Sequence, residues 1–204
     1  MIKKIGIINF GAGNYKSVCN MMKYLNEDFL PITNKSQLKN ISHIILPGVG
    51  SYDFVVNSLK SLNLFDEIGN KLLNGSFYLG ICVGMQILSS YGVENVRTDG
   101  YNLIPGSVEK IKTKKYSLPN IGWHKVKKLN DSRLFKHILD EEMIFYFIHS
   151  YHYKAQDLND CSSIIYYEDK IIASVEKGNV FGVQFHPEKS QTGGIKVLKN
   201  FCNL

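Results

Sequence analysis

Long hydrophobic runs are missing from this chain, and so are the usual marks of export. No stretch approaches the ~18 consecutive apolar residues of a membrane span. Segment 1–9 carries two lysines but only a short apolar run, and no small-residue cleavage site follows it. A secretory signal is therefore not indicated, and we expect a cytoplasmic protein that does not act at a membrane.

Cysteine is sparse, and its spacing excludes the usual paired sites. The four cysteines are Cys19, Cys82, Cys161 and Cys202, and none of them forms a C-x-x-C pair. Neither a zinc site nor a redox dithiol is therefore indicated, and the histidines form no H-x-H or H-E-x-x-H pair. Without a secretory signal, a disulfide framework is not expected. We expect no metal and no cofactor.

Arginine is almost absent from a chain that is otherwise basic. The formal net charge is +6 at pH 7, and lysine supplies nearly all of the positive charge, because Arg97 and Arg133 are the only arginines. Proteins that read nucleic-acid sequence rely on arginine at base edges, whereas net charge alone reports solubility. We interpret the lysines as a solvated surface and expect no nucleic-acid partner.

The rest of the composition is that of a globular protein, and the order of apolar runs and helical patterns indicates an α/β fold. The 204 residues suit a single domain, 1–204, that can bury most of its apolar surface. In the first half, apolar runs at 4–9, 41–46 and 76–81 alternate with helical periodicity, as at 17–25, and glycine-rich turns separate them. This pattern predicts a mostly parallel, flavodoxin-like sheet with helices on both faces.

The second half is predicted to be mostly strand, which adds an antiparallel region to the fold. Lys177-Gly178-Asn179 has the composition of a hairpin turn, and a closing helix is indicated near the C-terminal end. The candidate strands cover 106–111, 144–149, 162–167, 171–176 and 180–186.

Cys82 stands between two glycines, in the sequence Gly80-Ile81-Cys82-Val83-Gly84, where an apolar run gives way to a helical pattern. G-x-C-x-G between a strand and a helix is a nucleophile elbow with sulfur in place of the serine hydroxyl. The glycines relieve crowding at the turn, and a helix from Val83 to about Ser90 would direct its positive dipole end at the sulfur. Cys82 is therefore the candidate nucleophile, and the other cysteines are interpreted as core residues.

His186 ends the last predicted strand, and Glu188 follows it after Pro187. Sites in open α/β sheets form at the carboxyl ends of strands, so His186 can lie close to Cys82 despite their separation in the chain. A nearby carboxylate can bond the second ring nitrogen and orient the imidazole. We favour a Cys82–His186–Glu188 triad, and a satisfied surface histidine is the alternative.

Two glycine-rich turns follow other strands. Pro47-Gly48-Val49-Gly50 would let backbone N–H groups approach a ligand and form an oxyanion hole with the N–H of Val83, although an ordinary turn is an equal alternative. Gly11-Ala12-Gly13-Asn14 lacks the full G-x-G-x-x-G pattern, so it gives only weak support for a dinucleotide site.

Seven segments of the chain match family segments in family order: NFGAGNYKSV, ILPGVGSYD, LGICVGMQIL, IPGSV, NIGWHKV, FYFIHSYHY and ASVEKGNVFGVQFHPEKS. In these segments the chain resembles the class I glutamine amidotransferases, and within them the glutaminase subunits of imidazole glycerol phosphate synthases. The resemblance implies that Cys82 attacks the side-chain amide of glutamine to form a thioester and release ammonia. It also implies that His186 is the base and acid and that Glu188 orients it.

The same resemblance implies a binding site and a partner. Val49 lies on the segment that would complete the oxyanion hole, and glutamine would be held by Gly50, Gln86, Ser150 and Tyr151. The partner would be a (β/α)8 cyclase subunit in a heterodimer. Ammonia would pass through it to a ribulose-phosphate substrate, giving imidazole glycerol phosphate and an aminoimidazole carboxamide ribotide in histidine biosynthesis. Residues at or near the interface would be Asn14, Trp123, Tyr146 and Lys189.

Departures from the family pattern leave the ammonia acceptor open. His124 stands where the family usually has asparagine, and segment 91–101 is shorter than usual. NYKSVCNMMKYL is also somewhat similar to paralogues that supply ammonia for amidine formation on a surface-polysaccharide sugar. A stand-alone cysteine hydrolase or peptidase of the same fold is another alternative. The intact Cys82, His186 and Glu188 argue against a fourth alternative, a non-catalytic module.

Overall fold

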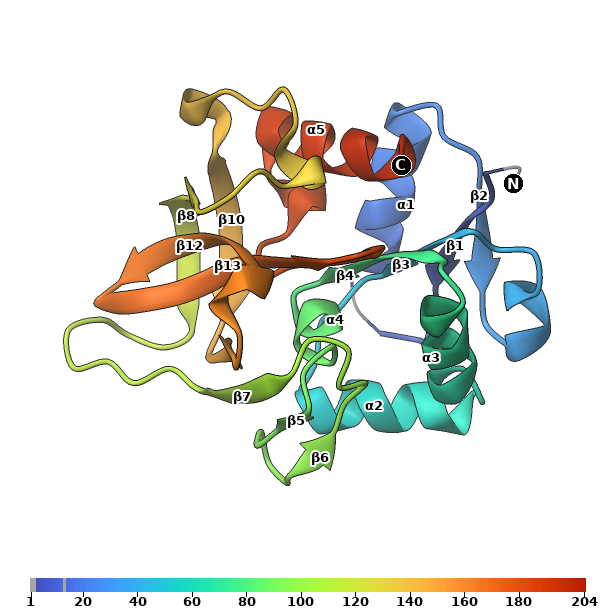
Figure 1. Ribbon diagram of the computed structural model, residues 1–204, viewed down its shortest axis with the longest axis horizontal. Helices are drawn as coiled ribbons and strands as arrows, with labels where there is room; N and C mark the ends of the chain where they lie inside the picture. The colour runs from blue at the N-terminus through green and yellow to red at the C-terminus, as the bar shows by residue number, and fades with distance from the viewer. Residues whose placement is uncertain (1–2, 13) are drawn as a thin grey trace.

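A computed structural model describes residues 3–12 and 14–204, so Met1, Ile2 and Gly13 of the first glycine-rich turn lie outside the described residues. The chain forms a sheet in the order β2-β1-β3-β4-β14-β13-β12-β9. Figure 1 shows this sheet crossing the middle of the molecule. Its strands are β1 (Ile5–Ile8), β2 (Phe29–Ile32), β3 (His43–Leu46), β4 (Phe77–Ile81), β9 (Lys127–Lys128), β12 (Cys161–Tyr167), β13 (Asp169–Lys177) and β14 (Val180–Val183).

Neighbouring strands are parallel from β2 to β14 and antiparallel from β14 to β9. The expected α/β fold with an added antiparallel region is therefore confirmed. β1 and β3 are buried along their whole length, as strands covered on both faces must be. The predicted hairpin turn is also present, because Lys177 pairs with Val180 across Gly178 and Asn179.

Helices cover both faces of the sheet. They are α1 (Tyr15–Tyr24), α2 (Tyr52–Ser61), α3 (Phe65–Leu73), α4 (Val83–Gln86) and α5 (Gln191–Cys202). Figure 1 shows α1 and α5 on one side and α2, α3 and α4 on the other. In α1, Val18 and Met22 point at one face of the sheet, while Val55 and Leu59 of α2 belong to the apolar layer on the opposite face. Each pair is spaced by one helical turn, which produces the apolar stripe that the sequence pattern indicated.

Two smaller sheets flank the carboxyl ends of the parallel strands. One pairs β8 (Asn120–Lys125) with β10 (Ile144–His149), and the other has the order β11-β7-β5-β6. β8 was not expected, because only one of its faces is buried and glycine and polar residues interrupt its pattern. The remaining strands are β5 (Tyr91–Gly92), β6 (Thr98–Asp99), β7 (Gly106–Lys110) and β11 (Tyr151–Ala155).

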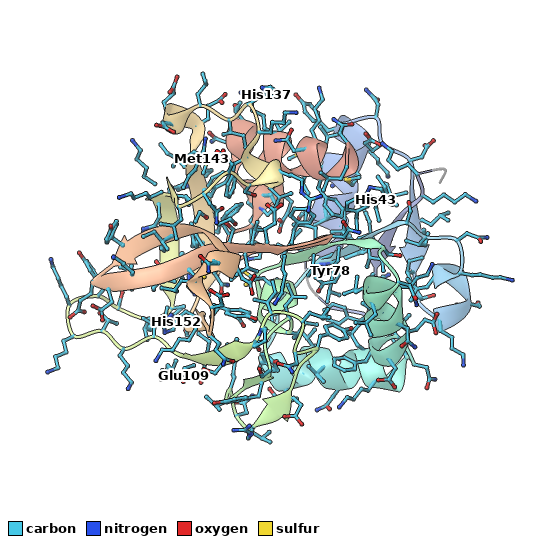
Figure 2. The ribbon with its side chains drawn as sticks, in the orientation of Figure 1. His43, Tyr78, Glu109, His137, Met143 and His152 are labelled. Carbon is cyan, nitrogen blue, oxygen red and sulfur yellow. The ribbon has the colours of Figure 1, made fainter. Side chains whose placement is uncertain are left out.

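The helix after Cys82 is much shorter than expected. We expected it to reach about Ser90, but α4 ends at Gln86. The buried hydroxyl of Tyr78, in the centre of Figure 2, donates to the carbonyl of Gly84 at 2.7 Å. The N–H of Leu88 bonds Met85 instead of Gly84, so the helical pattern ends there. Such a short helix has a small dipole, which weakens the argument that it stabilises a thiolate.

The last strand is also shorter than the predicted 180–186. β14 ends at Val183, and the N–H of His186 then bonds the carbonyl of Tyr146 in the neighbouring small sheet at 2.9 Å. The chain therefore turns from one sheet toward the other, which brings His186 to the carboxyl end of β4. Among the residues described, no helix has the length and apolar character that crossing a membrane requires.

Candidate active site

Cys82 lies on a strained turn between β4 and α4. Its backbone has φ 53° and ψ −111°, a region that residues other than glycine rarely adopt. A Cβ on Gly80 would lie 2.2 Å from the carbonyl oxygen of Gly84, and one on Gly84 would lie 2.4 Å from that of Leu46. Both glycines are therefore required, because the backbones of the turn and the strands are in direct contact.

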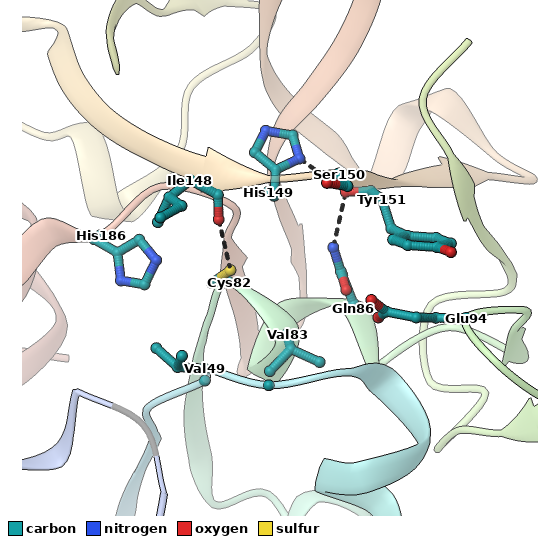
Figure 3. Close-up of a pocket in the computed structure, with 12 residues that line it drawn as sticks. Val49, Cys82, Val83, Gln86, Glu94, Ile148, His149, Ser150, Tyr151 and His186 are labelled. Carbon is teal, nitrogen blue, oxygen red and sulfur yellow. Dashed lines mark hydrogen bonds between the residues drawn. The ribbon is translucent and has the colours of Figure 1, made fainter. Parts of the chain in front are cut away.

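The Cys82 side chain opens into a cavity of about 120 Å³ (Figure 3). Segment 48–50 after β3 forms one wall, and segment 148–151 forms the opposite wall. All the residues expected to form the oxyanion hole or to bind glutamine therefore line one cavity at the sulfur. The lining residues are Gly48, Val49, Gly50, Cys82, Val83, Gln86, Glu94, Ile148, His149, Ser150, Tyr151 and His186.

His186 and Glu188 form a buried pair beside the cavity. Nδ1 of His186 is 2.8 Å from Oε1 of Glu188, and both side chains are almost fully buried. Because a carboxylate only accepts, Nδ1 carries the hydrogen of this bond. Asn14, expected at a partner interface, donates from Nδ2 to the same Oε1 at 3.0 Å. Glu188 therefore lies behind the ring, away from the cavity, and Asn14 holds its carboxylate.

The other ring nitrogen of His186 is the one available for proton transfer. Nε2 is buried and has no hydrogen-bond partner among the described residues, and Figure 3 shows the ring beside Cys82. Burial lowers the pKa of His186, but the neighbouring Cys82 sulfur and the Glu188 carboxylate outweigh it and raise the pKa to about 10. The site therefore favours a protonated His186 ring at neutral pH.

The remaining cysteines lie in the protein interior. Cys19, Cys161 and Cys202 are all buried free thiols, and none of them lines the cavity. Burial raises the pKa of Cys161 to about 11 and that of Cys202 to about 12. These two therefore stay protonated at neutral pH, and only the thiolate is an effective nucleophile.

Glu94 lines the cavity although sequence reasoning did not single it out. It lies in the segment between β5 and β6, and its carboxylate accepts the N–H of Tyr52 at 3.0 Å. Burial raises the pKa of Glu94. In Figure 3 it lies next to Gln86, on the side away from His186. Nothing in its local sequence distinguishes Glu94 from the other carboxylates of the chain.

His149 is the second residue that sequence reasoning left unassigned. It is buried in the cavity wall, and its Nδ1 lies 2.8 Å from the carbonyl oxygen of Tyr151. Burial lowers the pKa of His149 to about 4, so the ring is neutral at physiological pH. The histidines labelled in Figure 2, His43, His137 and His152, do not line the cavity.

Three of the four interface candidates lie together on the outer face of the β8–β10 sheet. The rings of Trp123 and Tyr146 are 5.9 Å apart, and Nζ of Lys189 lies 5.7 Å from the Tyr146 ring. Ile121 and Ile148 pair across the same strands and are exposed. The carbonyl of Ile148 is also 3.9 Å from the Cys82 sulfur, so this apolar face borders the cavity.

Comparisons with known proteins identify the relatives of this chain. The model of the family "Glutamine amidotransferase class-I" matches residues 7–204. The imidazole glycerol phosphate synthase subunit HisH of Pelagibacter ubique (strain HTCC1062) is 37% identical over 207 residues, covering 98% of this chain and 99% of that protein. The subunit of the same name from Leptospira borgpetersenii is 36% identical over 205 residues, covering 98% and 100%.

Solved structures show the same fold at lower identity. A crystal structure of a glutamine amidotransferase superposes with a TM-score of 0.74 at 16% identity, covering 98% of this chain and 97% of that one. The structure of PurLQS from Thermotoga maritima superposes with a TM-score of 0.73 at 22% identity, covering 100% and 99%.

Proposed function

This chain belongs to the class I glutamine amidotransferases, and we propose that it is the glutaminase subunit of an imidazole glycerol phosphate synthase. The observation that carries the proposal is the Cys82 turn beside the buried His186–Glu188 pair. The curated relatives, 37% and 36% identical along nearly the whole chain, are named as that subunit. Their names favour histidine biosynthesis over sugar modification and over a stand-alone hydrolase. A cytoplasmic location and a single domain over 1–204 remain predictions.

In the first chemical step, the Cys82 thiolate attacks the side-chain carboxamide carbon of glutamine, and the C=O electron pair moves to oxygen. The backbone N–H groups of Val49 and Val83 stabilise this oxyanion. His186 then gives its Nε2 proton to the leaving nitrogen and the C–N bond breaks. Ammonia leaves, and a glutamyl thioester remains on Cys82.

In the second step, water attacks the thioester carbon while the neutral His186 accepts its proton. Collapse of the intermediate breaks the C–S bond, releases glutamate and regenerates the thiolate beside the imidazolium. Glu188 holds Nδ1 at 2.8 Å throughout, so Nε2 stays directed at the reacting atoms. Asn14 fixes the carboxylate and, through it, the ring.

Glu94 is proposed to bind the α-ammonium group of glutamine. It is the only carboxylate among the described residues that line the cavity, and no lysine or arginine lines it. A partly buried carboxylate gains most from a positive partner, and the ammonium is the positive group of this substrate. Gln86 lies between Glu94 and the segment 150–151, so these groups surround one end of the substrate.

Replacing Glu94 with glutamine is expected to raise the KM for glutamine about tenfold with little change in kcat, because it removes a charge-assisted contact but leaves an acceptor for the Tyr52 N–H. Initial rates of glutamate release over a range of glutamine concentrations measure both constants. Glu109→Gln is the matched control, since Glu109 pairs with Lys154 and does not line the cavity. An unchanged KM would contradict this assignment.

A (β/α)8 cyclase subunit is the proposed partner in a heterodimer, and the apolar face of the β8–β10 sheet is its proposed docking surface. Trp123 is 47% exposed and Ile121 is 57% exposed, and with Ile148 on the paired strand they form a contiguous exposed apolar patch, which marks an interaction site better than isolated side chains do. Because this face borders the cavity, a subunit bound there could receive ammonia without its release to solvent. Lys189 would add a charged contact at the same surface.

Replacing Trp123 with glutamate is expected to weaken association with the cyclase subunit at least tenfold, because aromatic anchors contribute most to such interfaces. Titration calorimetry of the purified chain with the cyclase subunit measures the affinity. Leu158→Glu is the control, since Leu158 is 71% exposed but lies outside the proposed docking surface. Equal affinities for Trp123→Glu and the parent chain would argue for a different docking surface.

A further inference from the structure

The side-chain amide of Gln184 lies against the Cys82 sulfur, and neither of the two chemical steps above involves it. The side-chain nitrogen of Gln184 is 3.5 Å from Sγ of Cys82. Gln184 follows β14 directly and is completely buried. Its backbone N–H donates to the backbone carbonyl of Ala173 at 2.8 Å. Since α4 is too short to supply a large dipole, a donor at the sulfur would add to the stabilisation that the His186 ring gives a thiolate.

The orientation of the Gln184 amide follows from its neighbours. The carbonyl of Tyr151 can only accept, so the side-chain group of Gln86 that lies 3.0 Å from it must be the NH₂ (Figure 3). The same NH₂ lies 3.0 Å from the Gln184 side chain, which must therefore present its oxygen. The opposite side of the Gln184 amide, its NH₂, then faces the sulfur as a donor.

A second set of hydrogen bonds holds the Tyr151 carbonyl in place. His149 donates to it from Nδ1, so its Nε2 is left as an acceptor for the Asn120 amide at 3.1 Å. The oxygen of Asn120 then accepts from Nε2 of His124 at 2.7 Å. The hydrogen bonds thus form one continuous network from His124 on β8 to the Cys82 sulfur, and the donor and acceptor of each bond are assigned. His124, which departs from the family pattern, is its outermost member.

We propose that Gln184 is a catalytic residue whose N–H donates to the Cys82 thiolate and favours it over the thiol. Gln86 and His149 are positioning residues: Gln86 donates directly to the Gln184 oxygen, and His149 acts through the Tyr151 carbonyl that Gln86 also bonds. Ionisation breaks the S–H bond of Cys82 and transfers its proton to Nε2 of His186. The thiol can donate to the Ile148 carbonyl, 3.9 Å away, whereas the thiolate can only accept, and Gln184 supplies a charge-assisted donor. This inference rests on the proposed role of Cys82 as nucleophile.

Gln184→Met tests the proposal, because methionine keeps the shape and burial of glutamine but has no donor. The rate of Cys82 alkylation by iodoacetamide is followed between pH 5 and pH 10 by peptide mass spectrometry. We expect the pH of half-maximal alkylation to rise by about one unit. We also expect kcat for glutamine to fall about tenfold with KM nearly unchanged. The titrating groups of the site are the same in both proteins: His186 and His149 in the cavity wall, Glu94 beside Gln86, and Glu188 behind the His186 ring.

Two further variants complete the test. Gln156→Met makes the same exchange at an exposed position and should leave the alkylation profile unchanged. Gln184→Glu keeps the oxygen that accepts from Gln86 but places a second oxygen at the sulfur. The alkylation midpoint should rise further in this variant, which also serves if Gln184→Met does not fold.

An unchanged alkylation midpoint in folded Gln184→Met or Gln184→Glu would overturn the proposal, even if kcat fell, since a purely structural role would lower kcat alone. The proposed function is tested separately by the parent chain. If Cys82 alkylation depends on Gln184 but the parent chain with its cyclase subunit releases no glutamate, the thiolate assignment stands and the glutaminase assignment fails.

Discussion

Replacing Cys82 with alanine is expected to lower glutamine hydrolysis on the order of 10⁴-fold or more and to leave the fold intact. The chemistry is lost because no other described thiol lines the cavity. The fold is retained because alanine keeps the Cβ and loses only a sulfur at the cavity wall. Glutamate release with the cyclase subunit present measures the activity, and the midpoint of thermal unfolding measures the fold.

Cys19→Ala is the matched control, since Cys19 lies on α1 outside the cavity and should be dispensable for turnover. A diazo-ketone analogue of glutamine gives a second readout, because it should label Cys82 and none of the other cysteines. The pKa of Cys161 and that of Cys202 are raised by burial, which keeps both thiols protonated. Turnover by Cys82→Ala at the parent rate would show that the nucleophile is another group.

The purified chain alone is expected to hydrolyse glutamine at least about a hundredfold more slowly than in complex with a cyclase subunit and its ligand. Val49 lies in the cavity wall between Gly48 and Gly50, on the segment whose N–H must point at the oxyanion. The family resemblance implies that this N–H faces away until the partner binds its ligand. A misdirected oxyanion donor raises the activation free energy by about 3 kcal/mol, which lowers the rate by roughly a hundredfold.

Steady-state glutamate release tests this coupling in three samples: the chain alone, the chain with the cyclase subunit, and the complex with the ligand of the cyclase added. We expect the large increase only in the third sample. The Trp123→Glu variant should lose this increase at subunit concentrations that saturate the parent chain. High activity of the chain alone, unchanged by the partner, would favour the stand-alone cysteine hydrolase.

Local sequence determined the strand–turn–helix units and the residues that end them. Continuous apolar runs followed by Gly-rich turns are sufficient to predict β1, β3 and β4, because buried parallel strands have no polar face. Gly80 and Gly84 on either side of Cys82 also indicated a sharp turn. Backbone atoms lie so close to these two positions that any side chain would clash with them. The same reasoning brought Cys82, segment 47–50 and His186 to one edge of the sheet.

The tertiary structure alone decided which other side chains line the cavity or contact the sulfur. Glu94 carries no local signal, because carboxylates are common in loops. His149 and Gln184 lie within family-like segments, but those segments do not show which of their side chains turns toward the site. The length of α4 was also decided by tertiary structure, since the Tyr78 hydroxyl takes the Gly84 carbonyl that a longer helix would need. Hydrogen bonds between residues distant in the chain depend on how strands and turns pack, and periodicity reports only the face that each element buries.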